Sequence, residues 1–111
     1  MDNFFRELER RARMAESLRE EYPVGTRILL NYMSGMDGDS HRIPDNTRGT
    51  VINEFDDDCQ LLVSFDNGHS MRLRYGEDSF RKLTDSEIAD ELSQKAYEAV
   101  KNGNVKVLYR A

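Results

Sequence analysis

The segment VSFDNGHSMRLRY (residues 63–75) most constrains the fold, because apolar and polar residues alternate on both sides of a turn rich in Asp, Asn and Gly. Alternation with a period of two predicts two β-strands, each with one apolar face. A two-residue loop would place the two apolar rows on opposite faces of the hairpin. A three-residue loop (66–68) with Gly68 in the left-handed conformation pairs Val63 with Met71 and places both rows on one face. We predict the three-residue loop, because burying each such side chain contributes about 1.5–3 kcal/mol.

The middle of the chain, residues 23–83, is predicted to be one β domain. Its candidate strands are residues 26–33, 49–55, 60–65, 70–75 and 81–83. Short strands at this density, separated by turns that contain glycine, are typical of a small barrel or sandwich. Five strands that close on themselves would leave few exposed edges. We therefore predict a small five-stranded barrel whose outer surface, rather than an internal pocket, carries the function.

A helix is predicted on each side of this domain, so the fold class is α+β with three parts, residues 1–22, 23–83 and 84–111. The N-terminal helix (3–21) has an amphipathic pattern and ends before Pro23, because the residue before a proline is pushed out of the α region. Its apolar stripe contains Phe4, Leu8, Ala12, Ala15 and Leu18.

The C-terminal helix begins with a predicted capping box, in which the side chains of Thr84 and Glu87 each accept the other's backbone N–H. Gly103 supplies a stop for this helix. Residues 105–109 (VKVLY) are a candidate sixth strand that would pair with a barrel edge or with a second copy of the chain. The apolar stripe of the helix contains Ile88, Leu92, Ala96 and Ala99.

Composition limits the classes of function. The chain has 111 residues, 33% of them charged, and a formal net charge of −5, which indicates one soluble globular domain with a modest core. The acidic balance disfavours a duplex-binding surface, which has to neutralise phosphates. No apolar stretch reaches the roughly 20 residues that span a bilayer, and the N-terminus lacks the apolar core of a signal peptide. We therefore expect a cytoplasmic protein without membrane partners, and the single Cys59 excludes an intrachain disulfide.

Four blocks of the middle segment carry a family resemblance. They are YPVGTR (22–27), IPDNTRGTV (43–51), LVSFDNG (62–68) and GEDSF (76–80). In this order they resemble a small, functionally uncharacterised bacterial domain family with the pattern YPxGTR, GTxGTV, VxWDNG and DSF, which occurs on phages, prophages and conjugative elements. The resemblance implies an SH3-like barrel and the cytoplasm of a bacterial host cell, and it covers neither predicted helix. Phe65 stands where the family usually has tryptophan, which argues against an aromatic ligand platform.

The turn EFDDDC (54–59) is the first candidate partner-binding segment. Its carboxylates are Glu54, Asp56, Asp57 and Asp58. On one interpretation they imitate a row of phosphates and engage a basic cleft. On the other they are a solvated turn, neutralised within the chain by Arg72 and Arg74 on the outer face of the hairpin. We favour intramolecular pairing and keep both sets as candidate partner-binding residues.

The polar loop 34–46 is the second candidate, because long loops in small domains often border a ligand. Its Asp37 and Asp39 are candidate partner-binding residues, but with His41 they supply too few oxygen ligands for calcium, so no metal is expected. Catalysis finds little support, because the aspartates before Cys59 would raise the pKa of its thiol and neither histidine has a recognisable pairing motif. We expect no enzyme and no cofactor.

These observations predict a non-enzymatic protein-binding module of a phage or mobile genetic element. Its acidic surface would occupy a basic, nucleic-acid-binding groove of a host protein or protein–nucleic acid complex, as in an anti-CRISPR-like inhibitor of host defence. One alternative is a nucleic-acid accessory protein that uses Arg48, Arg72 and Arg74 on a basic sheet face. Another is a structural phage component that forms homo-oligomers through residues 105–109. The arginines of the N-terminal helix (Arg6, Arg10 and Arg13) are interpreted as a charge-laced solvent face rather than a nucleic-acid stripe.

Overall fold

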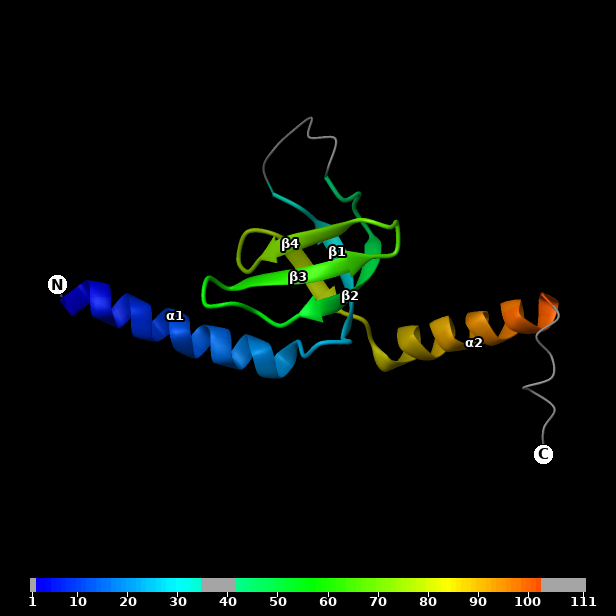
Figure 1. The fold of residues 1–111 in the computed structure, drawn as a ribbon, viewed down its shortest axis with the longest axis horizontal. Helices are drawn as coiled ribbons and strands as arrows, with labels where there is room; N and C mark the ends of the chain where they lie inside the picture. Colours follow the sequence, from blue (N-terminus) through cyan, green and yellow to red (C-terminus); the bar gives the residue numbers. More distant parts are fainter. Residues whose placement is uncertain (1, 35–41, 103–111) are drawn as a thin grey trace.

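The computed structural model describes residues 2–34 and 42–102 and contains a helix, five strands and a second helix in that order (Figure 1). The elements are α1 (Asp2–Glu21), β1 (Arg27–Tyr32), β2 (Thr47–Asn53), β3 (Gln60–Phe65), β4 (Ser70–Arg74), β5 (Ser79–Lys82) and α2 (Asp85–Lys101). The α+β fold class and the order of its elements are confirmed. The candidate strand over residues 105–109 lies outside the described residues. Across the described ranges, no helix combines the length and the apolar character needed to cross a bilayer.

The five strands form one antiparallel sheet in the order β4-β3-β2-β1-β5. In the described part of the chain no ladder pairs β4 with β5, so the predicted closure of the sheet is not made by backbone hydrogen bonds between its edges. The two edges are joined instead by a short turn with an isolated bridge between Tyr75 and Asp78. The buried Asp78 carboxylate accepts the backbone N–H of Arg74 at 2.8 Å and of Ser34 at 2.9 Å. One side chain therefore links the ends of β1 and β4.

The β3–β4 hairpin has the predicted three-residue loop. Val63 is paired with Met71 and Leu61 with Leu73, so both apolar rows lie on one face. The backbone N–H of Phe65 donates to the carbonyl oxygen of His69 at 2.8 Å, which closes the loop. The last loop residue, Gly68, has a φ of 92°, in the left-handed region that favours glycine.

The core lies inside the curled sheet and beneath the end of α1. Its fully buried members are Ile28, Leu30, Ile43, Val51, Phe55, Leu61, Val63 and Leu73. Gly49 lets β2 and β3 approach closely, because a Cβ there would lie 2.6 Å from Val63 Cγ1. The strand predicted over 49–55 ends at Asn53, and Phe55 leaves it to pack edge-to-face with Tyr22 at 5.7 Å between ring centroids.

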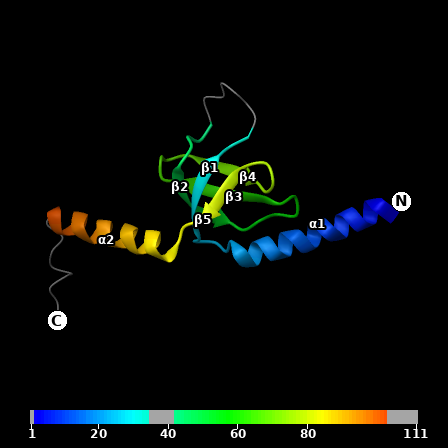
Figure 2. The same ribbon diagram turned by 180° about the vertical axis from the view of Figure 1, so that it is seen from behind.

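Helix α1 packs on the sheet only through its C-terminal half. Ala15, Leu18 and Tyr22 are buried, whereas Phe4 and Leu8, which continue the same stripe, are 62% and 45% exposed. Figures 1 and 2 show that the N-terminal half of α1 projects away from the sheet. The predicted amphipathic helix is confirmed, but only half of its apolar stripe has an intramolecular partner within the described chain.

Helix α2 projects in the opposite direction, which makes the molecule 66 Å long (Figure 2). The capping box is confirmed, since Thr84 Oγ1 accepts from Glu87 N at 3.1 Å and Glu87 Oε1 accepts from Thr84 N at 2.8 Å. None of the residues of α2 is buried, and Leu92 in its predicted apolar stripe is 62% exposed. The capping box therefore starts a helix that does not join the core.

The left-handed conformation of Gly68 generates the first prediction. Gly68→Ala should lower the free energy of unfolding by about 1–2 kcal/mol, because an L-residue with a side chain is strained there although the space around the position is open. Gly68→Asn is the matched variant and should cost less, since asparagine tolerates this conformation better. Urea denaturation measures both. Equal stability of the alanine variant and the wild type would contradict the assigned loop geometry.

Candidate functional site

The acidic turn between β2 and β3 is neutralised in part by two arginines. Arg19 in α1 donates a 2.6 Å hydrogen bond to Asp57 and a 2.7 Å hydrogen bond to the carbonyl oxygen of Phe55. Arg72 in β4 lies 3.6 Å from Asp56. The predicted pairing is thus confirmed for Arg72 with Asp56. The role of Arg19 escaped sequence analysis, because only the packing of α1 brings it to a turn 38 positions away.

The remaining carboxylates of this turn have different roles. Asp56 Oδ1 accepts the backbone N–H groups of Asp58 and Gln60, both at 2.9 Å, and so shapes the turn. Glu54 and Asp58 are exposed, and no described residue forms an ion pair with either of them. Mimicry of a phosphate row requires several unpaired charges on one surface. Two of the four predicted charges have no ion pair with a described residue.

Arg74 does not lie beside Glu54, and the prediction that it neutralises the acidic turn is wrong. Its guanidinium lies 2.8 Å from Glu77 and 3.5 Å from Asp78. The cause is the register of the hairpin, which places Arg74 at the end of β4, next to the turn that leads into β5. Arg74 therefore supports the junction of the two sheet edges.

The remaining candidates from the sequence are three residues of the polar loop and the single cysteine. Asp37, Asp39 and His41 lie outside the described residues. Cys59 is a half-buried free thiol whose Sγ lies 4.0 Å from the carbonyl oxygen of Arg11 in α1. In the described parts of the chain, no three His, Cys, Asp or Glu side chains gather where they could hold a metal ion.

A charged network that sequence analysis missed attaches α2 to the sheet. Arg27 in β1 forms two hydrogen bonds with the Asp66 carboxylate, at 2.8 and 2.7 Å. The same guanidinium binds both carboxylate oxygens of Glu91 in α2, with Nε 3.0 Å from Oε1. It also lies 3.1 Å from Thr50 Oγ1. Arg27 therefore connects a strand, the hairpin loop and α2.

Two further arginines extend this network. Arg48 in β2 lies 3.3 Å from Glu91 and 3.7 Å from Glu87. Arg81 in β5 donates two hydrogen bonds to Glu87, at 2.7 and 3.0 Å. Helix α2 is thus held by carboxylate–guanidinium contacts in its first two turns rather than by apolar burial. Arg48, a residue of the alternative nucleic-acid face, contributes to that attachment.

These contacts perturb the carboxylates of α2. Hydrogen bonds from Arg27 lower the pKa of Glu91. Hydrogen bonds from Arg81, with a smaller contribution from the N–H of Thr84, hold the pKa of Glu87 at about 2, below the ordinary value of 4.5. The hydrogen bond to Asp66 raises the pKa of Arg27. All three groups are therefore charged at neutral pH.

The projecting half of α1 exposes several large apolar side chains. We call residues 3–14 the α1 arm. Phe4, Phe5, Leu8 and Met14 are 40–62% exposed along it. The arm also contains four arginines and two glutamates, Arg6, Arg10, Arg11, Arg13, Glu7 and Glu9. Its surface thus combines apolar side chains with a local excess of positive charge.

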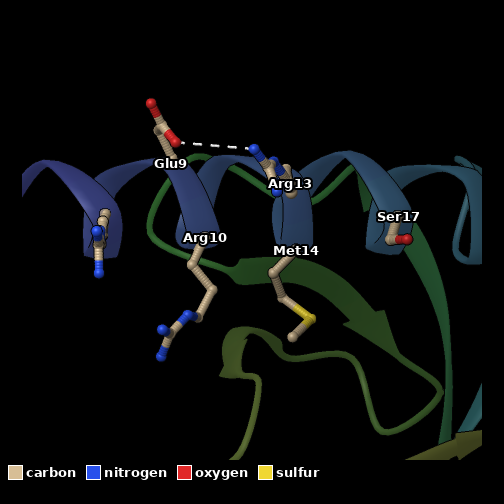
Figure 3. A pocket seen from close by; sticks show the side chains of 6 residues that line it. Glu9, Arg10, Arg13, Met14 and Ser17 are labelled. Atoms are coloured by element: carbon tan, nitrogen blue, oxygen red, sulfur yellow. Dashed lines mark ion pairs between the residues drawn. The ribbon is translucent and has the colours of Figure 1, made fainter.

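Figure 3 shows a shallow hollow along the side of this helix. Arg10 and Met14 project from the same side of α1, and Glu9 points away from them toward Arg13. The Glu9–Arg13 pair spans 3.7 Å and is exposed, so it contributes little to stability. A second hollow is lined by Met14 of the arm and by Cys59 of the β2–β3 turn, so the turn lies beside the arm. The arm and the acidic turn therefore form one continuous surface.

Comparison with known proteins adds one match. A family model described as "Domain of unknown function (DUF4314)" matches residues 11–83. No curated protein and no solved structure matches the chain. The matched range contains the sheet and the end of α1 that packs on it, and it begins after Phe4 and Leu8 and ends before α2. The first half of α1 and the whole of α2 thus lie outside the matched range.

The attachment of α2 generates a prediction about pH. In Arg81→Gln, Glu87 keeps the N–H of Thr84 but loses the guanidinium, so its pKa should rise from about 2 toward 4.5. Because this pKa is depressed by folding, the stabilisation is complete above about pH 4.5 and is lost as the pH falls toward 2. In the variant Glu87 takes up its proton at a higher pH, so the stabilisation that its charged form provides should be lost at a higher pH than in the wild type. Carboxyl NMR of Glu87 against pH measures the shift.

The control for this titration is Arg13→Gln, which removes the exposed partner of Glu9 on the distant arm. It should leave the Glu87 titration curve unchanged. An Arg81→Gln protein in which Glu87 still titrates near pH 2 would show that the guanidinium does not cause the low pKa.

Proposed function

This chain belongs to the DUF4314 family, and from that premise we propose that it is a non-enzymatic protein-binding module that docks on its partner through the α1 arm. The observation that carries the proposal is the interrupted burial of one apolar stripe. Ala15 and Leu18 are buried against the sheet, while Phe4 and Leu8 continue the stripe into solvent. An amphipathic helix of this kind fits an apolar groove on another protein.

The energetics of the α1 arm support docking. Burial of Phe4 and of Leu8 in a partner's groove would each contribute up to about 1.5–3 kcal/mol, before the cost of association is subtracted. The helix already exists in the described chain, because its C-terminal half is anchored by the sheet. A preformed helix loses less conformational entropy on binding than a segment that must fold at the same time.

The neighbouring charges define the expected rim of the partner's groove. Exposed arginines of the arm favour carboxylates on one side of the groove, and the exposed Glu54 and Asp58 favour basic residues on the other. We expect this partner among host proteins, including the nucleic-acid-binding proteins of host defence, because the sequence blocks of the middle segment resemble those of proteins on phages and mobile elements. Occupation of a basic groove would then involve the two unpaired carboxylates rather than the whole acidic turn.

Direct binding of nucleic acid through the sheet is the weaker alternative. The three arginines that this function requires each face a carboxylate of the same chain. Arg48 faces Glu91, Arg72 faces Asp56 and Arg74 faces Glu77. Release of phosphate counterions needs cationic groups free to contact phosphates, and these pairs would have to break first.

Leu8→Asp tests the docking surface. The substitution should weaken the complex by about 10-fold or more, because it removes an apolar contact and buries a charge in an apolar groove. Tagged full-length protein captures its partner from host lysate, mass spectrometry identifies the partner, and titration with the purified partner measures the affinity. Circular dichroism checks that the helix is intact.

Ser93→Asp is the control. It introduces the same charge at an exposed residue of α2, the other projecting helix, away from the α1 arm. It should bind the partner as the wild type does. Equal affinities of the two variants would refute docking through the α1 arm.

A further inference from the structure

A third hollow lies at the junction of the two sheet edges and shares no lining residue with the α1 arm. It has a volume of about 360 Å³. Three tyrosines, a phenylalanine and two carboxylates line it, namely Tyr22, Tyr32, Tyr75, Phe80, Glu77 and Asp78. The four rings come from the end of α1, from β1, from the end of β4 and from β5. The folding of the sheet therefore gathers aromatic side chains that are far apart in the sequence.

The rings of this hollow are held in place by contacts beneath it. Tyr22 packs edge-to-face on Phe80 at 5.6 Å between centroids, and Tyr75 packs edge-to-face on the buried Phe55 at 6.4 Å. Tyr32 and Tyr75 are 48% and 49% exposed, so both rings remain accessible to a ligand. Phe65, at the position where the resemblance expects tryptophan, is buried in the core and takes no part. Tyrosines thus provide the aromatic surface that Phe65 cannot.

The chemistry of the hollow favours a cation. The face of an aromatic ring attracts positive charge, and pockets formed by several rings are used to recognise ammonium groups. The ammonium group of Lys82 already lies 5.6 Å from the centroid of Tyr22, which shows that a ring of this cluster accepts a cation from the chain itself. Tyr32 and Tyr75 have no such cation among the described residues.

Two carboxylates and one arginine set the charge around the open rings. Asp78 is buried and bound to backbone N–H groups, so its charge is fixed in place. Glu77 is exposed and pairs with Arg74 at 2.8 Å. An exposed pair of this kind is weak, so a ligand cation can compete with Arg74 for Glu77.

We propose that the hollow formed by Tyr32, Tyr75 and Glu77 binds a lysine or arginine side chain of the partner protein. The inference rests on the proposed protein-binding function and adds a second contact point, separate from the α1 arm. The cationic group lies over the two exposed rings, and Glu77 accepts a hydrogen bond from it. Binding of one side chain is weak by itself and contributes to affinity when the α1 arm is docked.

The test uses short peptides and needs no partner. Acetyl-Gly-Arg-Gly-amide and its lysine analogue are titrated into the full chain, while NMR follows the ring signals of Tyr32 and Tyr75. Saturable shifts at both rings are expected. The citrulline peptide has nearly the same shape as the arginine peptide without the charge, and it should bind at least about threefold more weakly.

Variants locate the site. Tyr75→Ala and Tyr32→Ala should each weaken binding at least about threefold, and Glu77→Gln should weaken it about twofold. Tyr97→Ala is the control, because Tyr97 is a 64% exposed tyrosine on α2, outside the hollow. Unchanged signals from core residues such as Val63 show that each variant is folded.

Two outcomes would overturn the proposal. Equal binding of the arginine and citrulline peptides would show that charge is not recognised, and preferential binding of a proline-rich peptide would assign the hollow to an extended peptide instead. The Leu8→Asp protein should still bind the arginine peptide. Failure at the α1 arm and failure at this hollow are therefore separate results.

Discussion

The three-residue loop that ends in a left-handed Gly68 is the constraint on which the rest of the structure depends. It puts the apolar residues of β3 and β4 on the same face, and that face contributes Leu61, Val63, Phe65 and Leu73 to the core. The same loop positions Asp66, whose carboxylate holds Arg27. Since Arg27 also holds Glu91, the loop contributes both to the core and to the attachment of α2.

Different parts of the molecule are held in place by different kinds of interaction. Apolar burial holds the sheet and the end of α1 together, and these are the parts that the family match includes. Charged contacts attach α2, which has no fully buried residue, and the α1 arm meets only the edge of the core, where Cys59 lies 4.0 Å from the carbonyl oxygen of Arg11. A chain of this length can bury only a modest core, so its long helices leave apolar side chains in solvent. The proposed functions use the surfaces that remain after the core is complete.

Much of the candidate site could not be predicted from the sequence, because it depends on contacts between distant residues. The pairing of Arg72 with Asp56 followed from the expected neighbourhood of their strands and is confirmed. The expected role of Arg74 was wrong. The alternation of apolar and polar residues does not show which turn an arginine at the end of a strand will contact, and Arg74 contacts Glu77 in the turn after β4. Alternation assigned Tyr75 to the apolar row, yet it lies half exposed at the end of β4, beside tyrosines from other elements.

The sequence by itself determined the secondary structure, the capping box of α2 and the register of the β3–β4 hairpin. These features depend on local periodicity and on the backbone preferences of a few residues, which neighbouring positions decide. Only the tertiary structure decided which half of the α1 stripe is buried, which arginines are neutralised and how the sheet edges meet at Asp78. Those outcomes depend on how elements pack against one another, and an amphipathic pattern specifies an apolar face without specifying what covers it.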